Sequence, residues 1–100
     1  MAAAWKSIAD LEDHVRRHGR AVGARSIEQY AELAVVTIRD GVLFHYRLGS
    51  RRRIGRYHVR RGLFVALQEN GETILTLDRE SENYVRTLPD STYATERRPR

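Results

Sequence analysis

Two histidines, His14 and His18, are the residues of this chain whose type and spacing best suit chemistry. Side chains four residues apart lie one turn apart on the same face of an α-helix. Gly19 follows immediately, and glycine readily adopts the left-handed conformation that closes a helix. The spacing therefore predicts His18 at a helix C-terminus, where the helix dipole favours the protonated imidazole.

Nearby arginines indicate what the histidines could do. The four in this stretch are Arg16, Arg17, Arg20 and Arg25. Histidine changes its charge near neutral pH, which suits proton transfer. The arginine guanidinium matches the geometry of a phosphate group. The combination suits the cleavage of phosphodiester bonds.

A structural role for the histidines is the alternative. Ile8, Leu11 and Val15 form an apolar stripe with helical spacing, and His18 continues it three residues after Val15. The His18 ring could therefore pack at the edge of the core, and His14 could bond to an adjacent loop. The spacing alone leaves both roles open.

Length and composition exclude several classes of protein. The 100 residues suffice for one domain with a modest core. The chain contains no cysteine, which rules out disulfides and thiolate metal sites. His14 and His18 lack a convincing third ligand, so we expect neither a metal nor another cofactor. No apolar run approaches the roughly 20 residues that span a bilayer, and we expect no membrane partner.

The net charge of +5 is concentrated in the middle of the chain. Residues 41–68 contain seven arginines and no acidic residue. By contrast, residues 1–40 carry six basic and six acidic residues, and residues 69–100 carry five basic and seven acidic residues. A block of one-sided positive charge attracts polyanions such as nucleic acids.

Two helices are expected in the first forty residues. A capping pattern at Ser7 precedes a helix over Ile8–His18, and a second capping pattern at Ser26 precedes a helix over Ile27–Ile38. The hydrophobic period then changes from that of a helix to two, which indicates strands.

Four strands are expected in the second half: Val42–Leu48, Ile54–Val59, Leu63–Gln68 and Thr73–Leu77. A turn over Gly49–Arg53 and an Asn-Gly hairpin signal at residues 70–71 lie between strands. Connections this short require antiparallel neighbours. We therefore expect a single α+β domain with two N-terminal helices packed on a four-stranded antiparallel sheet. Residues 94–100 would form a disordered tail.

The two expected helices also carry a known pattern: residues 11–19 are L-E-D-H-V-R-R-H-G, and residues 26–30 are S-I-E-Q-Y. This pattern resembles the opening of bacterial polymorphic-toxin tips and phage-borne domains of the barnase–EndoU–colicin–RelE-like nuclease superfamily. Later landmarks of that family fall in order on Tyr57, Phe64, Asn70-Gly71 and Ile74-Leu75-Thr76. The resemblance covers about residues 8–78, which would form the nuclease-like core.

The resemblance implies a metal-independent ribonuclease that uses the RNA 2′-hydroxyl as internal nucleophile, acting on tRNA or another structured RNA. It makes His18 the candidate general acid or base, with His14 as its partner or its alternative. Arg20 and Arg25 could hold the scissile phosphate or be solvated. Thr76 could donate to a phosphate oxygen or be an ordinary strand residue.

Further residues would bind the RNA. Tyr57 could stack on a base or could be an aromatic residue of the sheet face. His45 and His58 are expected to be exposed or locally satisfied. If they line one face, the arginines of the strands and turns would grip the RNA backbone: Arg47, Arg51, Arg52, Arg53, Arg60 and Arg61.

The resemblance also implies a biological setting. Such a domain is delivered as the C-terminal tip of a secreted toxin and acts in the cytoplasm of a target bacterial cell. A cognate immunity or antitoxin protein would cover the arginines with an acidic surface, and the free domain would be a monomer. Two alternatives stay open: a non-catalytic RNA-binding module on the same fold, and a protein-interaction domain whose arginines are merely on the surface.

Overall fold

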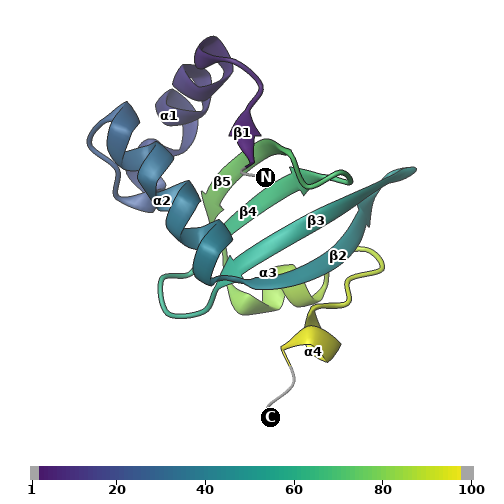
Figure 1. Ribbon diagram of the computed structural model, residues 1–100. Helices are drawn as coiled ribbons and strands as arrows, with labels where there is room; N and C mark the ends of the chain where they lie inside the picture. The colour runs from purple at the N-terminus through teal and green to yellow at the C-terminus, as the bar shows by residue number, and fades with distance from the viewer. Residues whose placement is uncertain (1–2, 98–100) are drawn as a thin grey trace.

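The computed structural model describes residues 3–97, which form an α+β domain (Figure 1). Two N-terminal helices pack against a five-stranded sheet, and two short helices follow the last strand. The elements are β1 (Ala4–Trp5), α1 (Ile8–Val22), α2 (Ile27–Asp40), β2 (Val42–Leu48), β3 (Arg51–His58), β4 (Leu63–Gln68), β5 (Thr73–Arg79), α3 (Glu82–Arg86) and α4 (Tyr93–Glu96). The expected fold class is therefore confirmed.

The sheet has the order β1-β5-β4-β3-β2. Strands β2 to β5 are antiparallel neighbours, as the short connections predicted. The expectation of four strands was wrong, because Ala4 and Trp5 add β1 in parallel alongside Thr73 and Ile74. A strand of two residues is too short to show a period of two in the sequence.

The core lies on both faces of the sheet. Alternate residues of β4, such as Val65 and Leu67, face the cluster that includes Tyr30 of α2. The intervening residues, such as Phe64, face a second cluster that includes Tyr93 of α4. Because β4 is covered on both faces, its sequence is a continuous apolar run rather than an alternating one.

Helix α1 extends one turn beyond the predicted end at His18. Gly19 is buried inside the helix, and the left-handed residue is Gly23, with φ of 81°. The amides of Gly23 and Ala24 donate to the carbonyls of Arg20 and Gly19, which closes a Schellman motif. The extra turn buries Val22 in the core, and this packing outweighs the weak helix propensity of Gly19.

The hairpin between β2 and β3 is tighter than expected. Its loop is only Gly49 and Ser50, and positive φ at the first of the two, 62° at Gly49, is the pattern of a type II′ turn. Pairing begins at Leu48 and Arg51, so residues 51–53 belong to β3 and not to a turn. Figure 1 shows this hairpin projecting on the side of the sheet away from α1.

The C-terminal region is folded further than expected. Residues 94–96 lie in α4, and the Arg97 guanidinium is 3.3 Å from the Glu82 carboxylate. Residues 98–100 of the predicted tail lie outside the described residues. The segment before α4 runs beside β2: the Arg47 amide donates to the Pro89 carbonyl at 2.8 Å.

Within residues 3–97, no helix combines the length and apolar character needed to cross a membrane.

Replacing two glycines by alanine tests where α1 ends. Gly19→Ala should raise the free energy of unfolding by about 0.5–1 kcal/mol, because the residue is helical and its new Cβ would meet Val15 at an ordinary 3.4 Å. Gly23→Ala should lower it by about 1–2 kcal/mol, because φ is positive there. Urea unfolding followed by circular dichroism measures both. A loss of stability in Gly19→Ala would instead place the helix end at Gly19.

Candidate active site

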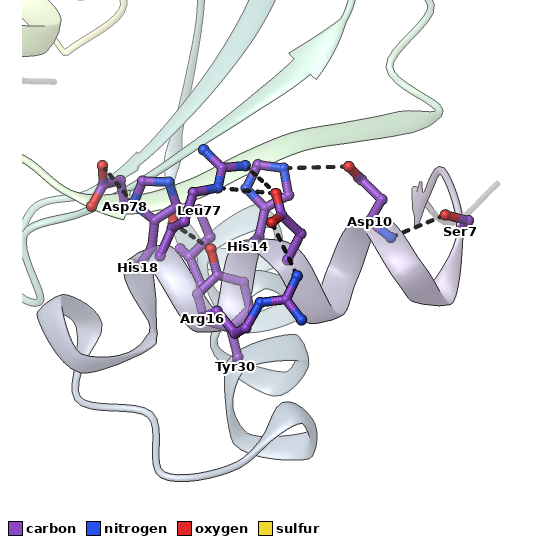
Figure 2. Close-up of polar contacts among 10 residues, drawn as sticks. Ser7, Asp10, His14, Arg16, His18, Tyr30, Leu77 and Asp78 are labelled. Atoms are coloured by element: carbon purple, nitrogen blue, oxygen red, sulfur yellow. Dashed lines mark hydrogen bonds and ion pairs between the residues drawn. The ribbon is translucent and has the colours of Figure 1, made fainter.

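His18 and Asp78 form the centre of the candidate site. Figure 2 shows their side chains pointing toward each other, with Nδ1 of His18 at 3.4 Å from Oδ2 of Asp78. Strand β5 pairs with β1 only through Thr73 and Ile74, so its outer edge beyond them is open to α1. The carboxylate reaches the imidazole at this edge. Both side chains remain partly exposed, His18 at 23% and Asp78 at 27%.

The Asp78 carboxylate is itself held in place. Its Oδ1 atom accepts a hydrogen bond of 2.8 Å from the backbone amide of Arg79, which leaves Oδ2 for His18. The 3.4 Å separation is slightly longer than a direct hydrogen bond, so the carboxylate acts on the ring through its charge: it favours a proton at Nδ1, which leaves the lone pair at Nε2. Within the described residues, Nε2 of His18 makes no hydrogen bond. This arrangement can accept or donate a proton at Nε2.

His14 lies directly beneath His18 in the helix. The two rings stack with centroids 5.7 Å apart, as the spacing of four residues predicted. His14 is only 8% exposed, and its other ring neighbour is Trp5 of β1 at 5.3 Å. Its Nε2 atom is 3.6 Å from Asp10, which is too long for a hydrogen bond. A substrate has little access to such a ring.

Burial determines the charge of His14. It lowers the pKa of the imidazole below 6.5, and this effect outweighs the opposing attraction of the Asp10 carboxylate. The Nδ1 atom of His14 is buried and has no hydrogen-bond partner within residues 3–97. Burial therefore favours the neutral form of His14, whose ring packs beneath that of His18.

Tyr30 fixes the strand that carries Asp78. Its hydroxyl donates a 2.6 Å hydrogen bond to the carbonyl of Leu77, the residue before Asp78. The ring is fully buried beside Trp5, and burial raises the pKa of the phenol well above its usual range. The tyrosine is thus a permanent donor that joins α2 to β5 (Figure 2).

Arg79 joins three elements at the same corner. Its Nε atom donates to the carbonyl of Ala21 in α1 at 2.7 Å, and its Nη1 atom donates to the carbonyl of Arg61 at 3.0 Å. Ala21 lies three residues after His18, so the Arg79 guanidinium brings positive charge to the end of α1 that carries the histidines. The β3–β4 turn containing Arg60 and Arg61 is held at this corner as well.

Thr76 lies two residues before Asp78 on β5, and strand pairing puts both side chains on the same face of the sheet. Thr76 pairs with Ala66, which belongs to the second core cluster, so the two side chains lie on the sheet face that α3 and α4 cover. A β-bulge at Leu75 changes the alternation just before Thr76. No hydrogen bond joins Thr76 to either histidine within the part of the chain that the structure describes.

Tyr57 is a core residue and does not form a stacking platform. It is 3% exposed, and its hydroxyl donates to the carbonyl of Glu80 at 2.9 Å. Its ring meets Tyr93 edge to face at 5.8 Å. Of the two roles that the sequence left open, the structure supports the aromatic residue of the sheet face.

Arg20 and Arg25 are both exposed and do not flank His18. Because α1 continues past Gly19, Arg20 is two helical positions after His18, or roughly 200° around the axis. Arg25 lies in the connection to α2, where its backbone amide donates to Gln29 at 2.7 Å. Of the two roles that the sequence left open for these arginines, their exposure fits solvation.

The remaining arginines divide into two groups instead of lining one face. Arg60 and Arg61 lie in the β3–β4 turn near Arg79, where His58 accepts a long 3.3 Å hydrogen bond from the Arg61 amide. The others lie at the opposite end of β3, and we call them the hairpin arginines: Arg47, Arg51, Arg52 and Arg53. His45, exposed on β2, lies near the second group.

Sequence analysis did not identify Asp78 and Arg79 as candidate site residues. The expected strand stopped at Leu77, which left both residues in a region with no assigned structure. Many carboxylates follow strands, and only the packing of α1 against β5 shows which one meets His18. The sequence feature that could have identified these two residues is an Asp-Arg pair that directly continues the last apolar strand.

Comparison of the chain with protein-family models, with curated proteins and with solved structures finds no match. The chemistry of the site must be inferred from its own geometry.

His14 should make the stability of the protein depend on pH. The unfolded chain binds a proton at His14 below its ordinary pKa of 6.5, whereas the folded chain resists protonation there because the site is buried. The free energy of unfolding should therefore fall as the pH drops below about 6.5 and should recover above it.

The measurement is urea unfolding at a series of pH values from about 5 to 7.5. His14→Phe keeps an aromatic ring beside Trp5 and should show a weaker pH dependence than the wild type. His45→Gln, on an exposed position, is the control and should retain the wild-type slope. Equal slopes in wild type and His14→Phe would show that His14 protonates as easily in the folded state.

Proposed function

We propose that the protein is a metal-independent endoribonuclease whose proton-transfer residue is His18, positioned by Asp78. One observation supports this proposal above all: a partly exposed imidazole with a carboxylate at Nδ1 and an unengaged Nε2 atom. A ring oriented in this way is the standard arrangement for general acid–base catalysis. The stacking of neutral His14 against it further restricts the ring.

The proposed reaction is transesterification at phosphorus. His18 Nε2 accepts the proton of the RNA 2′-hydroxyl, whose oxygen then attacks the adjacent phosphorus. The bond from phosphorus to the 5′-oxygen breaks, the leaving oxygen takes up a proton from water, and a 2′,3′-cyclic phosphate remains; His18 returns its proton to the solvent. Positive charge from Arg79 and the neighbouring arginines would stabilise the additional negative charge of the transition state.

The substrate and setting are proposals that follow from the histidine motif of α1. That motif favours tRNA or another structured RNA as the substrate and a toxin as the biological role. A toxin of this kind would act in the cytoplasm of a target bacterial cell and would be held inactive by an acidic immunity protein. The proposed reaction assigns no role to Thr76 or Tyr57.

A non-catalytic RNA-binding module is the second candidate function. The hairpin arginines favour it, because they lie at the opposite end of the sheet from His18 and need no proton transfer to bind RNA. Thr76 makes no hydrogen bond to either histidine within residues 3–97, which points the same way. The two candidates differ in whether RNA is cut.

The deciding experiment incubates the purified protein with total tRNA in EDTA and resolves the RNA on a denaturing gel. Wild type should produce discrete fragments that end in a cyclic phosphate. His18→Ala should reduce the rate about 10²–10⁴-fold, the usual contribution of a general acid–base group. Imidazole added to this variant should restore part of the rate, which a purely structural role would not allow.

Asp78→Asn tests the positioning role. The rate should fall and its pH profile should shift, because the amide no longer favours the productive tautomer of His18. Glu96→Gln, the same chemical change at an exposed position of α4, should retain wild-type activity. Intact RNA with every protein, together with a gel shift, would instead establish the binding module. Unchanged cleavage by His18→Ala would remove His18 from the reaction.

A further inference from the structure

The tip of the β2–β3 hairpin holds four arginines on rigid backbone. Pairing continues to Leu48 and Arg51 on either side of a two-residue loop. Arg51, Arg52 and Arg53 are therefore strand residues whose directions are fixed by the sheet. Alternate residues of a strand point to the same face about 6.6 Å apart, which places Arg51 and Arg53 together.

The like charges of the arginines at this tip destabilise the free protein. Arg47 lies directly opposite Arg52 across the hairpin, and like charges in that position are destabilising. Arg47 is 3.6 Å from the Asp90 carboxylate, which compensates one charge only. Within residues 3–97, Arg51, Arg52 and Arg53 form no ion pair. Such a concentration of positive charge would be relieved by a bound polyanion.

The tip is also hollowed. An open pocket of about 780 Å³ is lined by all four hairpin arginines together with polar side chains such as Gln68 and Asn70. A neighbouring pocket of about 600 Å³ shares Arg47, Arg52 and Arg53. The carboxylate of Glu69 lines both pockets, and that of Asp90 lines the second. The combined groove is far larger than one phosphate and offers hydrogen-bonding groups for sugars as well as phosphates.

The groove is well separated from His18. The Arg79 guanidinium ties the end of α1 to the β3–β4 turn, whereas the hairpin tip is at the other end of β3. The six residue-to-residue steps from Arg52 to His58 span roughly 20 Å along the strand. Figure 1 shows the tip projecting away from α1. A single nucleotide cannot reach both places.

We propose that the hairpin arginines form a second binding site for the phosphate backbone of RNA, distant from the catalytic corner. The cleavage part of this inference rests on the proposed function. The substrate is then an RNA long enough to occupy both sites. At about 3.4 Å per phosphate along a duplex strand, 20 Å corresponds to roughly six nucleotides. The geometry favours RNA of at least about six nucleotides over dinucleotides and shorter oligomers.

The first test measures binding without cleavage. The probe is a fluorescent 20-nucleotide stem-loop with 2′-O-methyl groups throughout, which leaves no nucleophile. The variant is Arg51→Gln/Arg53→Gln. The control is Arg39→Gln/Arg86→Gln, which removes the same charge from exposed arginines that lie beside Asp40 and Glu82. Thermal melting confirms that both double variants fold.

Anisotropy titrations at several salt concentrations give the affinity and its salt dependence. Arg51→Gln/Arg53→Gln should weaken binding at low salt at least tenfold and should reduce the slope of log K against log salt by about 1.4–1.8, or 0.7–0.9 for each lost phosphate contact. The control variant should stay within about twofold of wild type. Equal effects of the two double variants would overturn the proposal.

Competition distinguishes RNA from an acidic protein as the natural occupant. Polyglutamate of the same total charge should displace the stem-loop much less effectively than unlabelled 2′-O-methyl RNA. Equal displacement would overturn the assignment to RNA in favour of an acidic protein surface.

Cleavage assays then separate this inference from the proposed function. With unmodified RNA, the hairpin variant should raise KM for the stem-loop about tenfold and leave kcat and trinucleotide cleavage unchanged. A KM unchanged in the hairpin variant, with normal cleavage by wild type, would refute the second site and leave the ribonuclease intact. Absent cleavage with arginine-dependent binding would refute the ribonuclease and leave the RNA site standing.

Discussion

The hydrogen bond from the buried Tyr30 hydroxyl to the Leu77 carbonyl fixes the geometry on which the candidate site depends. It joins α2 to β5 inside the larger core cluster, where an unpaired polar atom would cost about 1–3 kcal/mol. Asp78 follows Leu77 directly, so the position of the carboxylate is set by this bond and by the packing of Leu77. His18 meets Asp78 only because α1 is packed on the same edge.

Much of the fold could be predicted from the sequence, because its larger elements have clear periodicity and recognisable ends. The Ser7 and Ser26 caps and the Asn-Gly turn are local signals, and the structure contains each of the elements that they indicate. The predictions were wrong where tertiary contacts determine the end of a helix or strand. Burial of Val22 carries α1 through Gly19, and strand pairing carries β3 back to Arg51. Neither contact is visible locally.

The candidate site was less predictable than the fold. The stacked histidines follow from helical spacing, and the structure contains that stack. The carboxylate partner of His18 comes from a strand sixty residues later, and the sequence does not show which carboxylate lies beside α1. The bulge at Leu75 is likewise absent from any local pattern, yet it determines the pairing of Thr76. The composition of the sequence identifies the hairpin arginines, whereas their separation from the histidines is known only from the topology of the sheet.

The segments at the two ends of the chain shield the margins of the sheet. β1 pairs with the start of β5, and the backbone at Pro89 and Thr92 forms hydrogen bonds with the outer edge of β2. Exposed strand edges invite pairing with other chains, and covering them is a common protection against aggregation. A protein that recognised this domain by adding a strand to its sheet would first have to displace one of these segments. Recognition through side chains, on faces or at the hairpin tip, avoids that cost.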